Sequence, residues 1–179
     1  MQYGLCYLSV VALRSEATDT SELISQVLYG DYFKVLEHRK SWSRIRLGFD
    51  KYEGWIDNKQ FQFIDELEYK ELHRSDPLMS NDLVDFITNQ KQQLHPILLG
   101  SALNGLPYLN HAFEGSKSIG SKDKTKLVET AILYLNTPYL WGGKTPFGID
   151  CSGFVQMVYK LNGFNILRCF STSISRGCS

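Results

Sequence analysis

The sequence predicts an α+β fold, with a small β-barrel in the N-terminal part and helices toward the C-terminal part. Residues 3–63 are a succession of short apolar, β-branched and aromatic runs separated by turn signals, a pattern typical of a small barrel. Residues 127–135 and 152–161 instead space their apolar positions three to four apart, which predicts amphipathic helices. With 179 residues, 43% of them apolar, the chain is long enough for one sizeable core or two small ones.

The barrel is expected to form a first domain of residues 1–63. Turn-forming residues separate its strands at Thr18-Asp19, at Gly30-Asp31 and at Asp50-Lys51. The expected strands are residues 4–14, 22–28, 32–38, 42–47 and 52–57.

A second segment, residues 64–118, is rich in Glu, Asp, Lys and Gln. Its apolar spacing predicts short helices in residues 67–73 and 81–90, the second with Ser80 as its N-cap. Residues 95–113 return to strand and turn chemistry, and a polar linker follows. We therefore expect a helical connector here, followed by a short β-rich unit.

Composition and charge argue against several classes of function. The 19 basic and 19 acidic residues leave no excess positive charge, so nucleic-acid binding has no electrostatic basis. The first residues lack a basic segment and are too short and interrupted for a convincing signal peptide or spanning helix. This predicts a cytoplasmic protein with no membrane segment, with periplasmic or cell-wall association as the alternative. No spacing of cysteines or histidines indicates disulfides or zinc, so no cofactor is expected.

Residues 138–154, PYLWGGKTPFGIDCSGF, carry the strongest functional signal. Asp150 is placed to cap a helix whose first turn contains Cys151, where backbone amide dipoles stabilise a thiolate. Tyr139 and Trp141 precede two glycines that let the backbone turn and approach closely, as the wall of a substrate cleft requires. The simpler alternative is an inert core cysteine, because free cysteines are among the most buried residues.

This segment resembles the NlpC family of papain-like cysteine peptidases, which cut bacterial peptidoglycan peptides. The matching positions are Pro138, Tyr139, Trp141, Gly142, Gly143, Gly148, Asp150, Cys151, Ser152 and Gly153. The resemblance implies that Cys151 is the nucleophile and that Tyr139 belongs to the oxyanion environment beside it. Residues 3–63 resemble a bacterial SH3-like domain, and by the same resemblance residues 64–118 hold a reduced second SH3-like unit.

The domain order resembles a subgroup that cleaves the γ-D-glutamyl–diamino acid bond of murein peptides with a free N-terminal L-Ala. In that subgroup an acidic residue, a tyrosine and the Asp beside the nucleophile hold the substrate ammonium. Local pattern carries these roles to Glu22, Tyr52 and Asp150, with Ser152 adding a hydroxyl and Trp141 lining the cleft. The alternatives are a solvated turn residue for Glu22 and packing on the barrel rim for Tyr52.

The family's general base, a histidine after the nucleophile, has no counterpart in this sequence. All four histidines, at positions 38, 73, 95 and 111, precede Cys151. The resemblance therefore implies a truncated peptidase domain in residues 119–179 that keeps its helices, lacks the C-terminal sheet, leaves helical apolar faces uncovered and has lost most of its activity. A non-catalytic module that binds cell-wall peptides is the alternative.

The last eleven residues, 169–179, lose the apolar periodicity of the preceding helix. One permissible back-translation of this tail, shifted by one frame, gives D-A-S-Q-Q-A-S-Q-G-V-A, which resembles the continuation of the family. We hypothesise a frameshift or sequencing error at Arg168.

Overall fold

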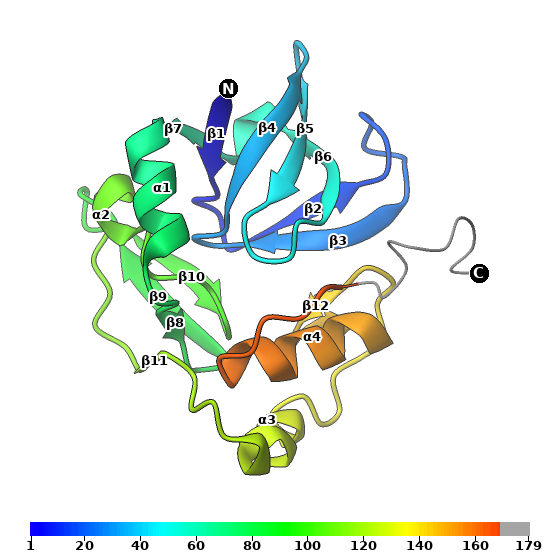
Figure 1. The fold of residues 1–179 in the computed structure, drawn as a ribbon, viewed down its shortest axis with the longest axis vertical. Helices are drawn as coiled ribbons and strands as arrows, with labels where there is room; N and C mark the ends of the chain where they lie inside the picture. Colours follow the sequence, from blue (N-terminus) through cyan, green and yellow to red (C-terminus); the bar gives the residue numbers. More distant parts are fainter. Residues whose placement is uncertain (169–179) are drawn as a thin grey trace.

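The computed structural model describes residues 1–168 and is built on a seven-stranded antiparallel sheet (Figure 1). Its strands are β1 (Gln2–Leu5), β2 (Val10–Arg14), β3 (Leu23–Leu28), β4 (Tyr32–His38), β5 (Trp42–Leu47), β6 (Glu53–Asp57) and β7 (Gln62–Ile64). Their order in the sheet is β3-β2-β6-β5-β4-β1-β7. The sheet curls round its own core, so the predicted N-terminal barrel is confirmed.

Alternating burial along the strands shows why these residues form a barrel. In β5, Ser43, Ile45 and Leu47 face inward while the arginines between them face solvent, as a half-buried strand requires. The barrel core consists of Cys6, Val11, Leu13, Val27, Phe33, Val35, Ile45, Leu47, Ile56 and Phe61. The expected β4 and β5 are confirmed with their bounds, and β3 and β6 each begin one residue later than expected.

The single strand expected over residues 4–14 is wrong, because this stretch contains two strands. The strand β1 ends at Leu5. The Cys6 amide still donates to the Asp31 carbonyl at 3.0 Å, in register with the β1–β4 pairing, but the Cys6 carbonyl accepts from Gly30, one position out of register. The strand β1 then pairs with β4 and β7, while β2 pairs with β3 and β6. The break is required because one straight strand could not pair with β3 and β6 near one edge of the sheet and also with β4 and β7 near the other.

The middle of the chain contains one long helix and two small sheets. Helix α1 (Glu66–Arg74) is the predicted connector helix, and Asp65 and Glu68 form a capping box at its start. The other elements are the 3₁₀ turn η1 (Asn58–Gln60), β8 (Met79–Ser80), β9 (Val84–Thr88), β10 (Leu94–Leu98), helix α2 (Leu106–Leu109) and β11 (Lys117–Ser118). Strand β9 pairs with β10, and β8 pairs with β11.

The helix predicted over residues 81–90 is wrong, because the structure has strand β9 there. Apolar residues at 84 and 87 suggested a helical face, but only Ile87 is buried and it pairs with His95 in the hairpin. Packing of Ile87 in the shared core decided the conformation, an example of tertiary context overriding local spacing. Residues 103–113, expected as strand and turn, contain helix α2, with Pro107 in its first turn.

One core joins the barrel to the middle segment. Its buried members are Tyr3, Leu5, Tyr29, Ile64, Tyr69, Leu72, Ile87, Ile97, Leu103, Leu109 and Phe113. These residues come from β1, β7, α1, the β9–β10 hairpin and α2, so the two segments form one packed body rather than independent modules.

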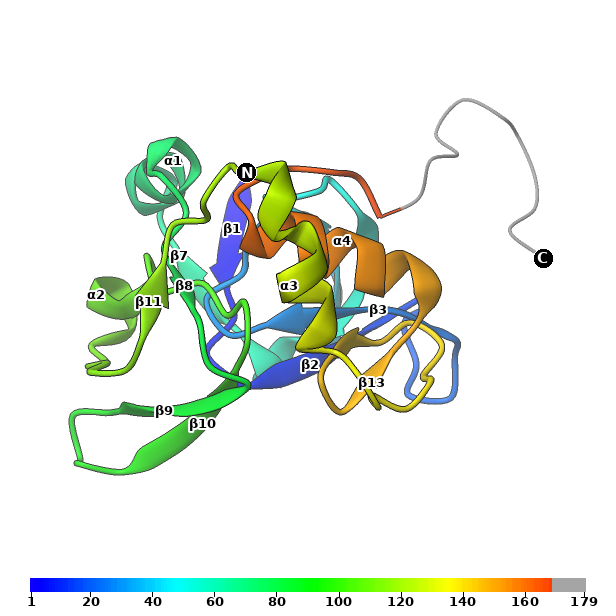
Figure 2. The same cartoon turned by 90° about the horizontal axis from the view of Figure 1, so that it is seen from below.

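The C-terminal part consists of two helices and a short hairpin. They are the 3₁₀ turn η2 (Lys124–Lys126), helix α3 (Leu127–Ile132), β12 (Lys144–Thr145), β13 (Gly148–Ile149) and helix α4 (Cys151–Leu161). Helix α4 lies beneath the end of the barrel, with α3 on its far side (Figures 1 and 2). Among residues 1–168, no helix combines the length and apolar character that crossing a membrane requires.

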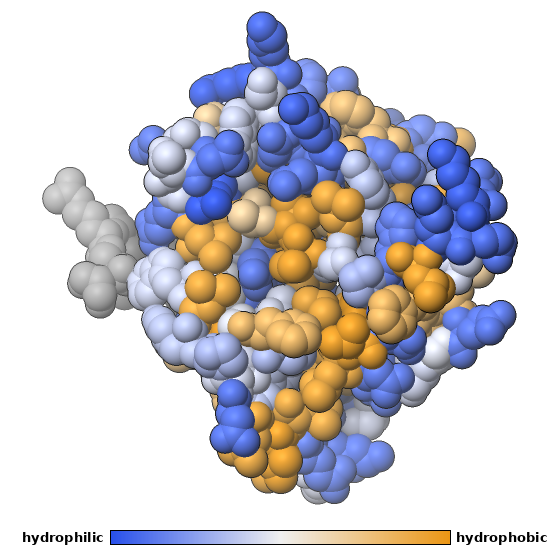
Figure 3. All heavy atoms as spheres, turned by 180° about the vertical axis from the view of Figure 1, so that it is seen from behind, coloured by the Kyte–Doolittle hydropathy of each residue, from blue (hydrophilic) through white to orange (hydrophobic). Residues whose placement is uncertain are grey.

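The expectation that both C-terminal helices expose apolar faces is wrong for α4 and confirmed for α3. Met157 and Leu161 of α4 are buried against Leu28 at the end of β3. On and after α3, by contrast, Ile132 is 60% exposed and Leu135 is 73% exposed. Figure 3 shows apolar side chains gathered at this end of the molecule. The barrel therefore buries one face of α4.

Candidate active site

Cys151 is the first residue of α4 and is exposed to solvent. The Asp150 carboxylate caps this helix by accepting the Gly153 amide at 2.6 Å. The predicted helix start is therefore confirmed, and the inert core cysteine is excluded for this position. Cys6 shows the contrast, since it is fully buried and desolvation raises the pKa of its thiol to about 12.

The Asp150 carboxylate is also the centre of a buried hydrogen-bond cluster. Besides Gly153, it accepts from the Ser152 hydroxyl at 2.9 Å, from the Gly142 amide at 2.9 Å and from Arg168 Nη2 at 2.7 Å. A carboxylate has about four lone-pair sites, and all of them are used here. The cluster holds the glycine turn, the start of α4 and the end of the described chain in one arrangement.

Two glycines are required where this arrangement is tightest. Gly142 has a φ of 77°, in the left-handed region, and a Cβ there would lie 2.4 Å from the Leu23 carbonyl oxygen. Gly153 packs against the same loop, because a Cβ would lie 2.2 Å from the Gly143 carbonyl oxygen. The close approach that the glycines predicted is therefore between the peptidase segment and the barrel, as well as within the loop.

Tyr139 lies near the start of α4 because its backbone pairs with Ile149. The Ile149 amide donates to the Pro138 carbonyl at 3.1 Å, and the Leu140 amide donates to the Ile149 carbonyl at 3.1 Å, so Tyr139 forms a parallel bridge two residues before Cys151. Its side chain is 68% exposed. The structure thus places Tyr139 at the surface of the site, next to the helix start.

Glu22 reaches the site from the barrel. It directly precedes β3, and its Oε1 accepts the indole Nε1–H of Trp141 at 2.7 Å. Trp141 in turn precedes Gly142, whose amide binds Asp150. Two carboxylates, one exposed and one buried, therefore flank the turn beside Cys151. Glu22 is engaged at a domain junction and is not simply a solvated turn residue.

Tyr52 lies on the barrel, directly before β6. Its side chain packs against the barrel core, and its amide donates to Asp50 Oδ1 at 3.0 Å. The link to α4 at this point comes from Asp50, whose Oδ2 accepts Gln156 Nε2 at 2.8 Å. Packing of Tyr52 on the barrel is therefore observed, and its contact with the substrate stays a prediction.

Three residues that the sequence did not single out attach the C-terminal part to the barrel. Lys160 Nζ lies 3.4 Å from Asp31 Oδ1, Gln156 binds Asp50, and Arg168 binds Asp150 and the Ile24 carbonyl. Gln156 and Lys160 are four residues apart on one face of α4, and this polar pair on an otherwise apolar helix was the available signal. No pattern indicated Arg168.

The four histidines are occupied elsewhere. His38 lies within hydrogen-bond distance of Ser43, His73 of Tyr32, His95 of Asn89 and His111 of Tyr29. Desolvation lowers the pKa of His73 and of His111. Among residues 1–168, no group of three His, Cys, Asp or Glu side chains is arranged to hold a metal ion.

Two family descriptions match the chain. Residues 13–61 match the bacterial dipeptidyl-peptidase Sh3 domain, and residues 136–175 match the NlpC/P60 family. The chain carries both domains. The NlpC/P60 match extends into residues 169–175, so it includes part of the tail predicted to be out of frame, which lies outside the described residues.

Curated relatives of this chain are named as peptidases. It is 28% identical to dipeptidyl-peptidase 6 of Lysinibacillus sphaericus, over 83% of this chain and 65% of that protein. It is 26% identical to the γ-D-glutamyl-L-lysine dipeptidyl-peptidase of Bacillus subtilis, over 80% of this chain and 55% of that protein. The chain thus spans between about half and two thirds of the length of these relatives.

Solved structures confirm the fold. An NlpC/P60 family protein from Bacillus cereus superimposes with a TM-score of 0.70 at 16% identity, over 93% of this chain and 74% of the other. An NlpC/P60 endopeptidase from Photobacterium damselae gives a TM-score of 0.67 at 16% identity, over 94% of this chain and 44% of the other. The arrangement of SH3-like barrel and NlpC/P60 helices therefore recurs in known proteins.

Proposed function

We propose that this chain carries the nucleophile and substrate-binding residues of a cysteine endopeptidase for murein peptides. The bond addressed is the one between γ-D-Glu and the diamino acid in peptides with a free N-terminal L-Ala. The observation that carries the proposal is the exposed Cys151 at a helix N-terminus, beside a carboxylate that the barrel contributes. The names of the relatives, which include γ-D-glutamyl-L-lysine dipeptidyl-peptidase, support the substrate class.

Glu22 is the residue that we assign to the substrate ammonium. It uses one oxygen for Trp141, which leaves lone pairs for a further donor, and the residue is exposed. Asp150 has its lone pairs filled by four donors and is only 8% exposed, so it acts on the ammonium through its field and through the geometry it imposes. Tyr52 stays a candidate for a further contact with the ammonium, as the sequence predicted.

In the proposed reaction the Cys151 thiolate attacks the γ-glutamyl carbonyl, an acid protonates the leaving amine, and water releases the acyl group. Tyr139 and backbone amides of the α4 first turn would face the developing oxyanion. The histidines of the sequence hydrogen-bond to residues outside this cluster, so we infer that the 179-residue polypeptide binds the peptide with little or no turnover. This also makes a non-catalytic peptide-binding module the second candidate.

The test is to incubate the chain with L-Ala-γ-D-Glu-diamino acid peptide, measuring binding by calorimetry and released dipeptide by mass spectrometry. We expect saturable binding that Glu22→Gln weakens and that Cys151→Ala leaves within about threefold, since the thiol does not hold the ammonium. Acetylation of the peptide's N-terminus should abolish binding. Equal binding of the free and acetylated peptides would refute the ammonium assignment, and turnover that survives Cys151→Ala would refute the cysteine mechanism.

Alkylation with iodoacetamide gives a second test that does not require turnover. Peptide mapping should show rapid labelling of the exposed Cys151 and no labelling of the buried Cys6 in the folded protein. Saturating peptide should slow the labelling of Cys151 if it occupies the same cleft.

The cytoplasmic location stays a prediction of the sequence.

A further inference from the structure

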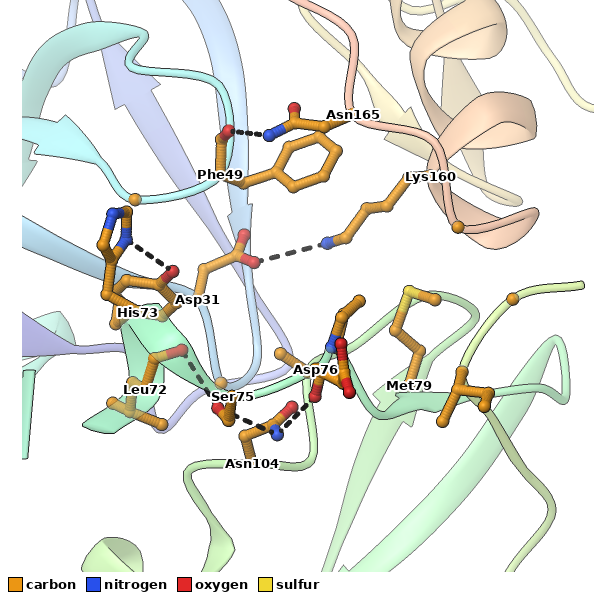
Figure 4. A pocket seen from close by; sticks show the side chains of 18 of the residues that line it. Asp31, Phe49, Leu72, His73, Ser75, Asp76, Met79, Asn104, Lys160 and Asn165 are labelled. Atoms are coloured by element: carbon orange, nitrogen blue, oxygen red, sulfur yellow. Dashed lines mark hydrogen bonds and ion pairs between the residues drawn. The ribbon is translucent and has the colours of Figure 1, made fainter. Parts of the chain in front are cut away.

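The structure contains a large cavity that none of the proposed site residues lines (Figure 4). Its volume is about 680 Å³, within the range of small-molecule sites. It lies where the β3–β4 turn, the segment after β5, the end of α1 and the C-terminal end of α4 meet. Cys151 is at the opposite end of α4, about 15 Å away along a helix of this length.

One cavity-lining residue, Lys144, is buried, but its ammonium is not among the fully enclosed unpaired atoms of residues 1–168. The residue is 2% exposed, and within residues 1–168 its ammonium makes no hydrogen bond or ion pair. The charged groups that act on it at longer range are Asp50, Asp31, Lys160 and Arg168. Desolvation lowers the pKa of Lys144. Because these carboxylates act only at longer range, the Lys144 ammonium is available to an anion that enters the cavity.

Lys160 lines the same cavity, and its ammonium has both a carboxylate and an aromatic partner. Its Nζ lies 3.4 Å from Asp31 Oδ1 and 5.1 Å from the centre of the Phe49 ring. Figure 4 shows Lys160 and Asp31 pointing toward one another across the cavity from α4 and the β3–β4 turn. Because Asp31 is committed to this pair, it is not free to neutralise Lys144.

The remaining lining decides what kind of ligand would fit. Four lysines and two aspartates line the cavity, so its charge favours an anion. The lysines are Lys51, Lys122, Lys144 and Lys160, and the aspartates are Asp31 and Asp76. Apolar side chains such as Phe49, Met79 and Phe164 complete the wall, which favours an organic body over a small inorganic ion.

We propose that this cavity is a second ligand site, distinct from the Cys151 cleft, for a small organic carboxylate of amino-acid or dipeptide size. The ligand's carboxylate binds the Lys144 ammonium, and its apolar part lies against Phe49 and Phe164. Lys144 belongs to β12, and its backbone amide donates to Gln26 Oε1 of the barrel at 2.7 Å. This contact fixes the base of the Lys144 side chain before the ligand binds. The proposal does not depend on the peptidase function.

The probe is N-acetyl-L-glutamate, which has two carboxylates and no free ammonium for Glu22. Calorimetry should give saturable binding to the wild-type chain and to Cys151→Ala and Glu22→Gln alike. Lys144→Met removes the charged end of the side chain and keeps its apolar stem, and it should weaken binding by about tenfold to a hundredfold, the cost of one charge-assisted hydrogen bond. Lys122→Met, at an exposed lining position, is the matched control and should change affinity by less than about threefold.

Thermal melting separates ligand binding from a structural role. N-acetyl-L-glutamate should raise the Tm of the wild-type chain and not that of Lys144→Met, and the unliganded variant should melt at or above the wild-type Tm because it lacks the unpaired charge. If Lys144→Met does not fold, Lys144→Gln serves for the same comparison. No saturable binding, equal binding by Lys144→Met, or inorganic phosphate binding as tightly as N-acetyl-L-glutamate would each overturn the proposal.

Discussion

Arg168→Met tests the buried ion pair that organises the start of the nucleophile helix. Arg168 Nη2 lies 2.7 Å from Asp150 Oδ2, and the two side chains are 2% and 10% exposed. Methionine fills a similar volume but leaves the Asp150 carboxylate without its counter-ion. The guanidinium also donates to the Ile24 carbonyl at 3.3 Å, so the substitution additionally loosens the contact with the barrel.

The expected cost follows from that burial. Breaking a buried pair by removing one partner costs about 3–5 kcal/mol, because the remaining charge is uncompensated. Asp150 keeps three other donors, which places the expectation at the lower end, about 3 kcal/mol. For a chain of this length such a loss corresponds to a Tm lower by about 6–12 °C.

The assay is urea unfolding followed by circular dichroism, with thermal melting in parallel. Lys70→Met is the matched control, since Lys70 pairs with Glu66 on an exposed helix face and its removal should leave the midpoint unchanged within error. The double variant with Asp150→Asn should recover part of the Arg168→Met loss, because the lone charge is then gone. A loss below about 1 kcal/mol for Arg168→Met would show that the pair is not buried in solution, and the reasoning on the helix start would fail.

Three further predictions concern other parts of the structure. Gly153→Ala should destabilise the fold by about 1–3 kcal/mol and slow alkylation of Cys151, because its Cβ would lie 2.2 Å from the Gly143 carbonyl oxygen; unchanged urea midpoints would contradict the packing. Ile132→Lys should change the free energy of unfolding by less than about 0.5 kcal/mol and reduce aggregation seen by light scattering, since Ile132 is 60% exposed. Wild-type stability should rise relative to Lys144→Met as pH increases from neutral toward the ordinary lysine pKa. Burial lowers the folded-state pKa of Lys144, so unfolding takes up a proton there; parallel pH profiles of the two chains would disprove this.

Local sequence predicted the candidate site better than the elements around it. The start of α4, the cap by Asp150 and the close approach at the glycines were expected from residue types alone, because each depends on contacts within a few positions. The strand β9 was predicted as a helix, because its apolar spacing fits both periods and only pairing with β10 distinguishes them. The role of Arg168 was also missed, since a single arginine after an apolar run has no pattern of its own.

Sequence alone determined the barrel in outline, the turns between its strands and the identity of the segment around Cys151. These depend on periodicity, turn chemistry and a contiguous motif, which act over short stretches of chain. Tertiary structure alone decided that Glu22 meets Trp141 across 119 positions, that the barrel buries one face of α4, and that Lys144 lies buried beside a cavity. Such contacts follow from how distant segments pack, and the residue types at either end carry no local signal of the partner that packing will bring to them.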